Sequence, residues 1–149
     1  MIPYRIQISH RDPLDDPRGT GAASQVRGFL ELPVDCIATT DVYTVCLDVA
    51  DTDVRHIAER IVNPVIQDWT LGHQAPDIPY HWVVIVGYRP GVTDNVARSA
   101  ASAITDILDR PLQPADVVYT SADYFLQAPP IAREGATRVA EELLANSLI

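Results

Sequence analysis

The histidines, serines and cysteines of this 149-residue sequence are its candidates for metal binding or nucleophilic catalysis. None of the four histidines stands at metal-ligand spacing from another histidine or from a cysteine. Ser24 and Ser102 lie in helical sequence without a histidine or cysteine at a matching distance. The pattern therefore predicts no metal centre and no nucleophile–base pair. A small enzyme that uses His10 or His81 stays open as an alternative.

The stretch Arg18–Gly21 contains two glycines, as phosphate-binding loops often do. It lacks the lysine and the further glycine of a P-loop, and the preceding Asp15 and Asp16 would repel a phosphate. Because glycine is a poor helix former, we interpret the stretch as the frayed start of a helix. Asp12 and the two later aspartates do not have the regular spacing of a calcium loop, so they indicate a solvated acidic turn.

An arginine and an aspartate recur at one fixed offset. When the sequence is shifted by 78 positions, Arg11 falls on Arg89 and Asp16 falls on Asp94. Residues 5–33 then align with 83–111 without a gap and share seven identities, whereas random pairing would give about two. Such self-similarity predicts an internal duplication.

Each of these aspartates stands where a helix N-cap is expected, directly before a helical pattern. We expect each arginine to pair with its aspartate or with a backbone carbonyl. The alternative is that the arginines contact a partner protein. The candidate structural or partner-interface residues are therefore Arg11, Arg89, Asp16 and Asp94.

The repeat divides the chain into two modules, residues 1–71 and 81–149. The segment 72–80 between them contains Gly72, Pro76 and Pro79 and no periodicity, which is typical of a linker. Each module is predicted to be βαββα, with a closing strand at 65–69 in the first only. Thr39-Thr40-Asp41 offers a turn, so the predicted hairpin arms of the first module are residues 35–39 and 42–49. The arms of the second module are 117–120 and 123–127.

These elements predict an α+β fold in which helices cover one face of a mostly antiparallel sheet, and in which the two modules form a pseudo-dimer. The run Val83–Val86 is apolar and β-branched, so we expect it in the middle of the sheet, covered on both faces. In the first helix, Val26 and Phe29 are expected to face the core. Pro129-Pro130 is expected to open the last helix.

Composition excludes several classes of function. The net charge is −9 and the chain contains no lysine, which argues against nucleic acids and anionic membranes as partners. Apolar runs are too short to cross a bilayer and the N-terminus lacks a signal-peptide core, so a cytoplasmic location is expected. In that compartment Cys36 and Cys46 are expected to be free thiols.

The order of several short motifs resembles the PurS-type small subunit of phosphoribosylformylglycinamidine synthase. In the first module these are Asp16-Pro17-Arg18-Gly19, Val42-Tyr43-Thr44 and Asn63-Pro64-Val65-Ile66-Gln67-Asp68. In the second module they are Arg89-Pro90-Gly91-Val92-Thr93-Asp94-Asn95, Val118-Tyr119-Thr120-Ser121 and Leu143-Leu144-Ala145-Asn146. A tandem of such modules is found at the front of some bacterial versions of the synthase, and the resemblance covers nearly the whole chain.

The resemblance implies a non-catalytic role in de novo purine biosynthesis. In that family, ATP and magnesium belong to a PurL-type synthetase part, and a cysteine nucleophile belongs to a PurQ-type glutaminase part. The PurS part carries no cofactor; it supports contact between the other two and ammonia transfer. Separate PurS chains dimerise, so a homo-oligomer stays open. The alternative is a ferredoxin-like regulatory module that binds a small metabolite at the inter-module interface.

Overall fold

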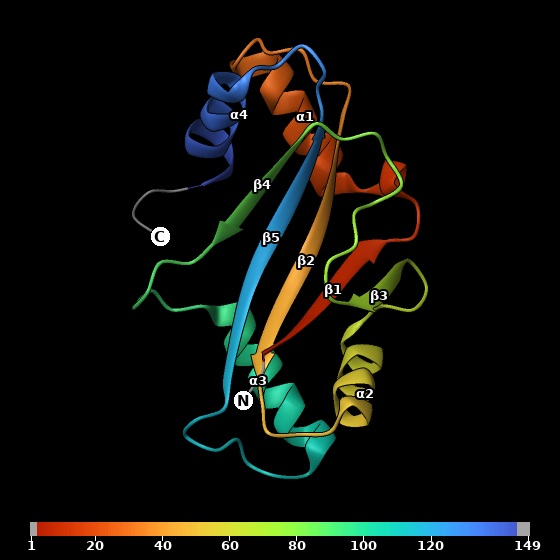
Figure 1. Cartoon of the computed structure of the whole chain (residues 1–149), viewed down its shortest axis with the longest axis vertical. Helices are drawn as coiled ribbons and strands as arrows, with labels where there is room; N and C mark the ends of the chain where they lie inside the picture. Colours follow the sequence, from red (N-terminus) through yellow and green to blue (C-terminus); the bar gives the residue numbers. More distant parts are fainter. Residues whose placement is uncertain (1–2, 146–149) are drawn as a thin grey trace.

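The computed structural model describes residues 3–145, in which five strands and four α-helices are distributed along the whole length (Figure 1). The strands are β1 (Tyr4–His10), β2 (Cys36–Cys46), β3 (Gln67–Leu71), β4 (Trp82–Gly87) and β5 (Val117–Gln127). The α-helices are α1 (Pro17–Phe29), α2 (Asp51–Ile61), α3 (Asn95–Leu108) and α4 (Arg133–Val139). A 3-10 turn η1 (Pro13–Asp15) precedes α1, and a π-helical segment η2 (Ala140–Leu144) continues α4. No helix within the described residues has the length and apolar character needed to cross a bilayer.

The five strands form one sheet in the order β3-β1-β2-β5-β4, and all neighbours are antiparallel. This confirms the predicted α+β class with an antiparallel sheet. The centre is the pair β2–β5, whose register runs from Cys36 opposite Gln127 to Cys46 opposite Val117. The two parts of the chain therefore meet edge to edge within one sheet, rather than by stacking their sheet faces.

Both predicted hairpins are wrong, because β2 and β5 are each one continuous strand of 11 residues. The supposed first turn, Thr39-Thr40-Asp41, lies inside β2 and pairs with β5 throughout. Neither strand contains the glycine, proline or asparagine that a tight hairpin turn requires. β-branched threonine favours an extended backbone, so the chain passes straight through.

The predicted central position of Val83–Val86 is also wrong, since β4 is at one edge of the sheet. Val84 faces the helices and is only 8% exposed, whereas Ile85 on the other face is 66% exposed. A short apolar run does not by itself separate a central strand from an edge strand. The middle of the sheet is instead occupied by β2 and β5, the two longest strands, each of which pairs with a strand on both sides.

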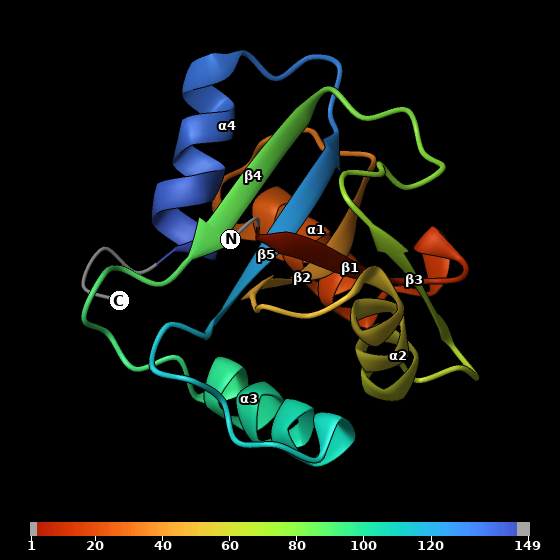
Figure 2. The same cartoon turned by 60° about the horizontal axis from the view of Figure 1, so that its bottom comes forward.

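The helices cover one face of the sheet in two pairs, one at each end (Figures 1 and 2). In the first cluster Val26 of α1 packs with Leu126 of β5 and Val139 of α4. In the second, Ile57 of α2 packs with Ile6 of β1 and Ile104 of α3. Each pair combines one helix from residues 4–71 with one from residues 82–145, so both clusters need both parts of the chain.

The first helix differs from its prediction at both ends. It begins directly at Pro17 behind a capping Asp16, so the expected frayed start is wrong. Phe29, expected in the core, is 78% exposed, whereas the next residue, Leu30, packs against the first cluster. The last helix begins at Arg133 rather than at the two prolines.

The segment 72–81 contains no helix or strand and contacts the face of the sheet opposite the helices. The Arg5 guanidinium donates to the carbonyl of Gly72, and the Gln7 side-chain amide donates to the carbonyl of Gln74. Tyr80 packs edge-on against Phe125 with ring centroids 5.2 Å apart. These contacts bury part of a sheet face that the helices leave open.

Candidate functional site

Asp16 is the most enclosed of the predicted site residues, with 1% of its surface exposed. One carboxylate oxygen accepts from the backbone N–H of Gly19 at 2.9 Å, which caps α1 as predicted. The other accepts from both the backbone N–H and the hydroxyl of Thr39, each at 2.6 Å. The side chain therefore joins the start of α1 to the centre of β2.

Asp94 makes the same set of bonds at the other copy of the motif. Its oxygens accept from the N–H of Ala97 at 2.8 Å, and from the N–H and hydroxyl of Thr120 at 2.9 and 2.7 Å. The aspartate joins α3 to β5, as Asp16 joins α1 to β2. Both predicted caps are confirmed, and each has a threonine partner that sequence reasoning missed.

The two sites differ in depth, because α1 lies unusually close to β2. A Cβ at Gly19 would be 2.0 Å from the carbonyl oxygen of Ile37. The residue at the matching place in α3 is Ala97, which already has a Cβ. Asp94 is accordingly half-buried.

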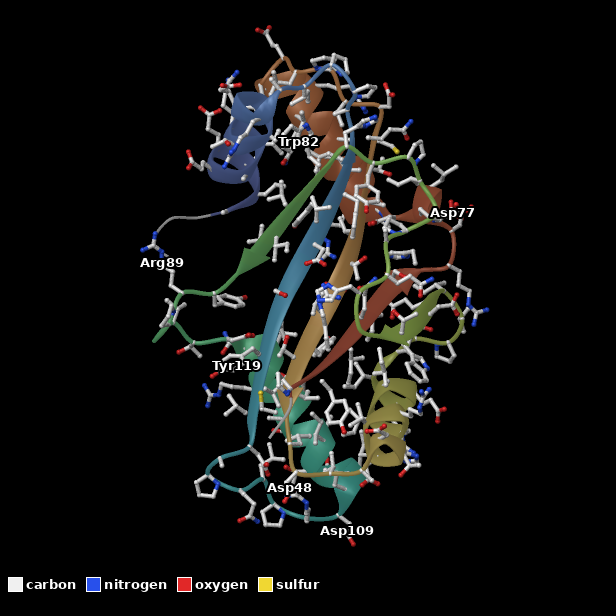
Figure 3. The ribbon with its side chains drawn as sticks, in the orientation of Figure 1. Asp48, Asp77, Trp82, Arg89, Asp109 and Tyr119 are labelled. Atoms are coloured by element: carbon white, nitrogen blue, oxygen red, sulfur yellow. The ribbon has the colours of Figure 1, made fainter. Side chains whose placement is uncertain are left out.

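The expected pairing of each arginine with its capping aspartate is wrong for Arg11. Its Nε atom is 3.2 Å from a carboxylate oxygen of Asp68, at the start of β3. The oxygens of Asp16 are already occupied by α1 and β2. Arg89 extends outward beyond the end of β4 (Figure 3) and is exposed. It forms no ion pair with any carboxylate in the described part of the chain.

A cavity of about 310 Å³ lies between the first turns of α1 and α3, on the helix-covered side of the sheet. Arg18 contributes a guanidinium that pairs with Asp41 at 2.8 Å and lies over the Tyr124 ring at 5.6 Å. The wall combines both parts of the chain, with Tyr43 from β2 and Thr120 from β5. Apolar walls come from Val86, Val96 and Leu144.

The polar groups of this cavity suit binding better than catalysis. Burial, assisted by the charges of Asp41 and Asp94, raises the pKa of Tyr43, so its phenol stays protonated and can donate a hydrogen bond. Arg18 and Asp41 supply one positive and one negative group. Such a set can orient a small polar molecule, with no nucleophile beside a base among the lining residues.

A buried polar network on the opposite sheet face was not anticipated from the sequence. Arg5 reaches across β2 to form an ion pair with Asp123 of β5, and both side chains are at most 16% exposed. One oxygen of Asp123 and the hydroxyl of its cross-strand neighbour Thr40 are buried without a hydrogen-bond partner. The alternation of Arg5 and Gln7 with apolar residues is the only sequence signal for this polar face.

The two histidines singled out by sequence lie in different surroundings. His10 is 4.0 Å from Asp16 through its Nε2 atom, whereas Nδ1 of His81 accepts from the N–H of Ala128 at 3.2 Å. Within residues 3–145 no group of three or more His, Cys, Asp and Glu side chains is placed to hold a metal ion.

Both cysteines are free thiols, as predicted. The thiol of Cys36 donates to the side-chain oxygen of Gln127 at 3.1 Å. Burial, with a contribution from Asp35, raises the pKa of the Cys36 thiol and so keeps it in its unreactive protonated form.

No model of a known protein family matches this sequence, and no curated protein matches it with significant similarity.

Proposed function

We propose that this chain is a non-catalytic assembly part of phosphoribosylformylglycinamidine synthase, built from two PurS-like modules. The observation that carries the proposal is the repeated aspartate site. Asp16 and Asp94 are 78 positions apart, and each caps a helix while accepting two bonds from a strand threonine. Both aspartates belong to the motifs on which the PurS resemblance rests.

The arrangement of the central strands supports a pseudo-dimer. Pairing a strand with a related strand in antiparallel register is what a two-fold axis between identical subunits produces. The pair β2–β5 has this register over 11 residues, and its strands follow the related helices α1 and α3. A tandem chain of this kind would be a covalent form of the dimer that separate PurS chains make.

In this role the chain binds the PurL-type synthetase and the PurQ-type glutaminase and holds them in position for ammonia transfer in the cytoplasm. ATP and magnesium stay with the synthetase. The exposed apolar residues Val83 and Ile85 of β4, with Tyr88 directly after it, support a docking surface along this strand.

The test is reconstitution with the synthetase and glutaminase chains. We expect the chain to co-purify with both. We also expect its omission to lower glutamine-dependent synthesis of formylglycinamidine ribonucleotide, while synthesis from free ammonia is retained, because only ammonia transfer is interrupted. Unchanged glutamine-dependent activity, together with no binding to either chain, would remove the proposal.

The cavity between the two parts of the chain favours a second candidate, a regulatory module that binds a small metabolite there. Arg18, Asp41 and Tyr43 come from one part and Thr120 from the other, so a ligand would contact both. A thermal-shift screen with purines, glutamine and glycine tests it. One saturable shift that is lost in Arg18→Ala and kept in Arg27→Ala would support this function; no shift with any of them would reject it.

A further inference from the structure

The outer edge of β1 is closed by β3. The two strands pair antiparallel, and the backbone bonds continue past both ends of the pair. The N–H of Gly72 donates to the carbonyl of Arg5 at 2.9 Å, and the N–H of Arg11 donates to the carbonyl of Ile66 at 3.0 Å. The outward backbone groups of β1 are therefore satisfied within the chain.

The outer edge of β4 has no such partner among residues 3–145, because β4 pairs only with β5. The carbonyl of Leu126 points toward β4 and accepts from His81. Alternation of the backbone then directs the groups of Trp82, Val84 and Val86 to β5. Those of Val83, Ile85 and Gly87 point outward along the free edge.

Free edges of natural sheets are usually protected by charges, prolines or bulges, because they can pair with other chains. The strand β4, Trp82–Gly87, has no charged residue and no proline. The other sheet edge, β3, contains Asp68 in an ion pair with Arg11. Of the two sheet edges, β4 is therefore the one without a charged residue.

The side chains along β3 indicate what would fit β4. Trp69 lies opposite Ile8 and Leu71 lies opposite Ile6, on the side of the helices. At the offset of 78 positions, Val86 and Val84 take the places of these two isoleucines. Val86 lines the 310 Å³ cavity together with the apolar side chains of Tyr88 and Leu144, so there is room beside it for a large apolar side chain.

The two sheet edges also differ in the pairing of the arginine that follows β1 or β4. Arg11 pairs with Asp68 of β3, the residue directly before Trp69. Arg89 takes the place of Arg11 at the end of β4 and has no carboxylate partner in the described residues. An incoming strand with an acidic residue before its large apolar residue would supply one.

We propose that the β4 edge is the docking site for an extended acidic segment of a partner protein, which joins the sheet as a sixth strand antiparallel to β4. The segment has the pattern acidic–aromatic–any–aliphatic; its acidic residue pairs with Arg89 and its aromatic residue enters the cavity beside Val86. The identity of the partner as the rest of the synthase rests on the proposed function. The docking site at β4 and the sequence pattern of the incoming segment do not depend on it.

The test uses a labelled ten-residue peptide with the sequence of residues 63–72 as the probe, titrated into the whole chain and followed by fluorescence anisotropy. We expect saturable binding, and slowed hydrogen exchange at the amides of Val83 and Ile85. Arg89→Glu should weaken binding about five- to tenfold, because attraction becomes repulsion. A peptide with arginine in place of its aspartate should recover the loss.

Arg98→Glu is the matched control, since it makes the same charge change on exposed α3 and should leave binding unchanged. Ile85→Pro removes an outward donor, which edge strands tolerate, and should abolish binding while circular dichroism stays native. Equal weakening by Arg89→Glu and Arg98→Glu, absence of saturable binding, or protection of β4 only through self-association at high concentration would each overturn the proposal.

The peptide titration and the reconstitution with synthetase and glutaminase together separate this inference from the proposed function. Synthetase and glutaminase binding without peptide binding would remove the docking site and keep the assembly role. Peptide binding without synthetase or glutaminase binding would keep the docking site and remove the assembly role.

Discussion

Asp16 and Asp94 accept hydrogen bonds from matching donors, yet the first is 1% exposed and the second is half-buried. The difference follows from one methyl group. At Gly19, α1 approaches β2 so closely that no Cβ would fit, whereas the matching residue of α3 is Ala97, whose Cβ needs space between helix and strand. A bond that solvent cannot replace contributes more to stability than the same bond near water. We therefore expect Asp16 to contribute more than Asp94 to the free energy of unfolding.

The largest expected effect is that of removing the buried cap. Asp16→Ala should lower the free energy of unfolding by about 4 kcal/mol, because a cap is lost and the N–H and hydroxyl of Thr39 are left buried without a partner. Asp94→Ala should cost about 2 kcal/mol, since water can reach the partly exposed Thr120. Urea denaturation of both variants measures the difference. Equal losses of stability in the two variants would contradict the argument that burial strengthens the hydrogen bonds of Asp16.

Substitutions at Gly19 and Ala97, the matching positions of the two helices, should have nearly as large an effect. Gly19→Ala should cost about 3 kcal/mol, since its Cβ would meet a backbone carbonyl that cannot turn away. Ala97→Gly should cost about 1 kcal/mol, the ordinary penalty of glycine in a helix. Thermal unfolding of each variant gives the comparison, and a harmless Gly19→Ala would show that α1 can move off the sheet.

The loop before β5 contains a carboxylate, Asp116, that is stabilised in its charged form. The carboxylate of Asp116 accepts from the N–H of Gln113 at 2.7 Å and from Arg110, and these bonds, the backbone bond foremost, lower its pKa against the opposing effect of burial. A lowered pKa in the folded state adds stability above the ordinary carboxyl pKa of about 3.9, and this is lost as the pH falls through the folded value.

Asp116→Asn should therefore lower the melting temperature at pH 7, and the gap to the parent chain should close as the pH falls below about 4. The matching residue before β2 is Asp35, which is exposed, and Asp35→Asn serves as the control with little change at pH 7. Scanning calorimetry across the pH range measures both. A gap for Asp116→Asn that stays constant with pH would contradict the carboxylate's role.

The smallest expected effect separates the two arginines. Arg11→Ala should cost about 0.5 kcal/mol, because its ion pair with Asp68 is more than half exposed. Arg89→Ala should leave the stability of the isolated chain unchanged, since it has no ion-pair partner in residues 3–145. Chemical denaturation with replicate measurements resolves this, and a cost at Arg89 would indicate a contact within the chain.

Local signals in the sequence were reliable where the structure depends on neighbours along the chain. The two aspartate caps and the buried position of Val26 in α1 are as predicted. These features need only helical or strand periodicity and a capping side chain. The chain's class of fold was therefore accessible from sequence.

Features that depend on distant residues were not accessible. Thr39 was interpreted as part of a turn because its true partner, Asp16, is 23 positions away. Arg11 was assigned to the nearby Asp16 instead of Asp68, 57 positions away. Gly19 was interpreted as a weak point of the helix, although its lack of a side chain is what allows α1 to approach Ile37. In each case a non-local contact decided the role of a locally ambiguous residue.

The central pairing of β2 with β5 also has a consequence for synthesis of the chain. Cys36 and Gln127 are 91 positions apart, so the middle of the sheet cannot close until nearly the whole described chain has left the ribosome. Until then β2 would present one unpaired edge, and each helix cluster would lack a helix. Contacts of such long sequence separation predict slow folding, and they place the late-emerging β5 at the step that completes the sheet.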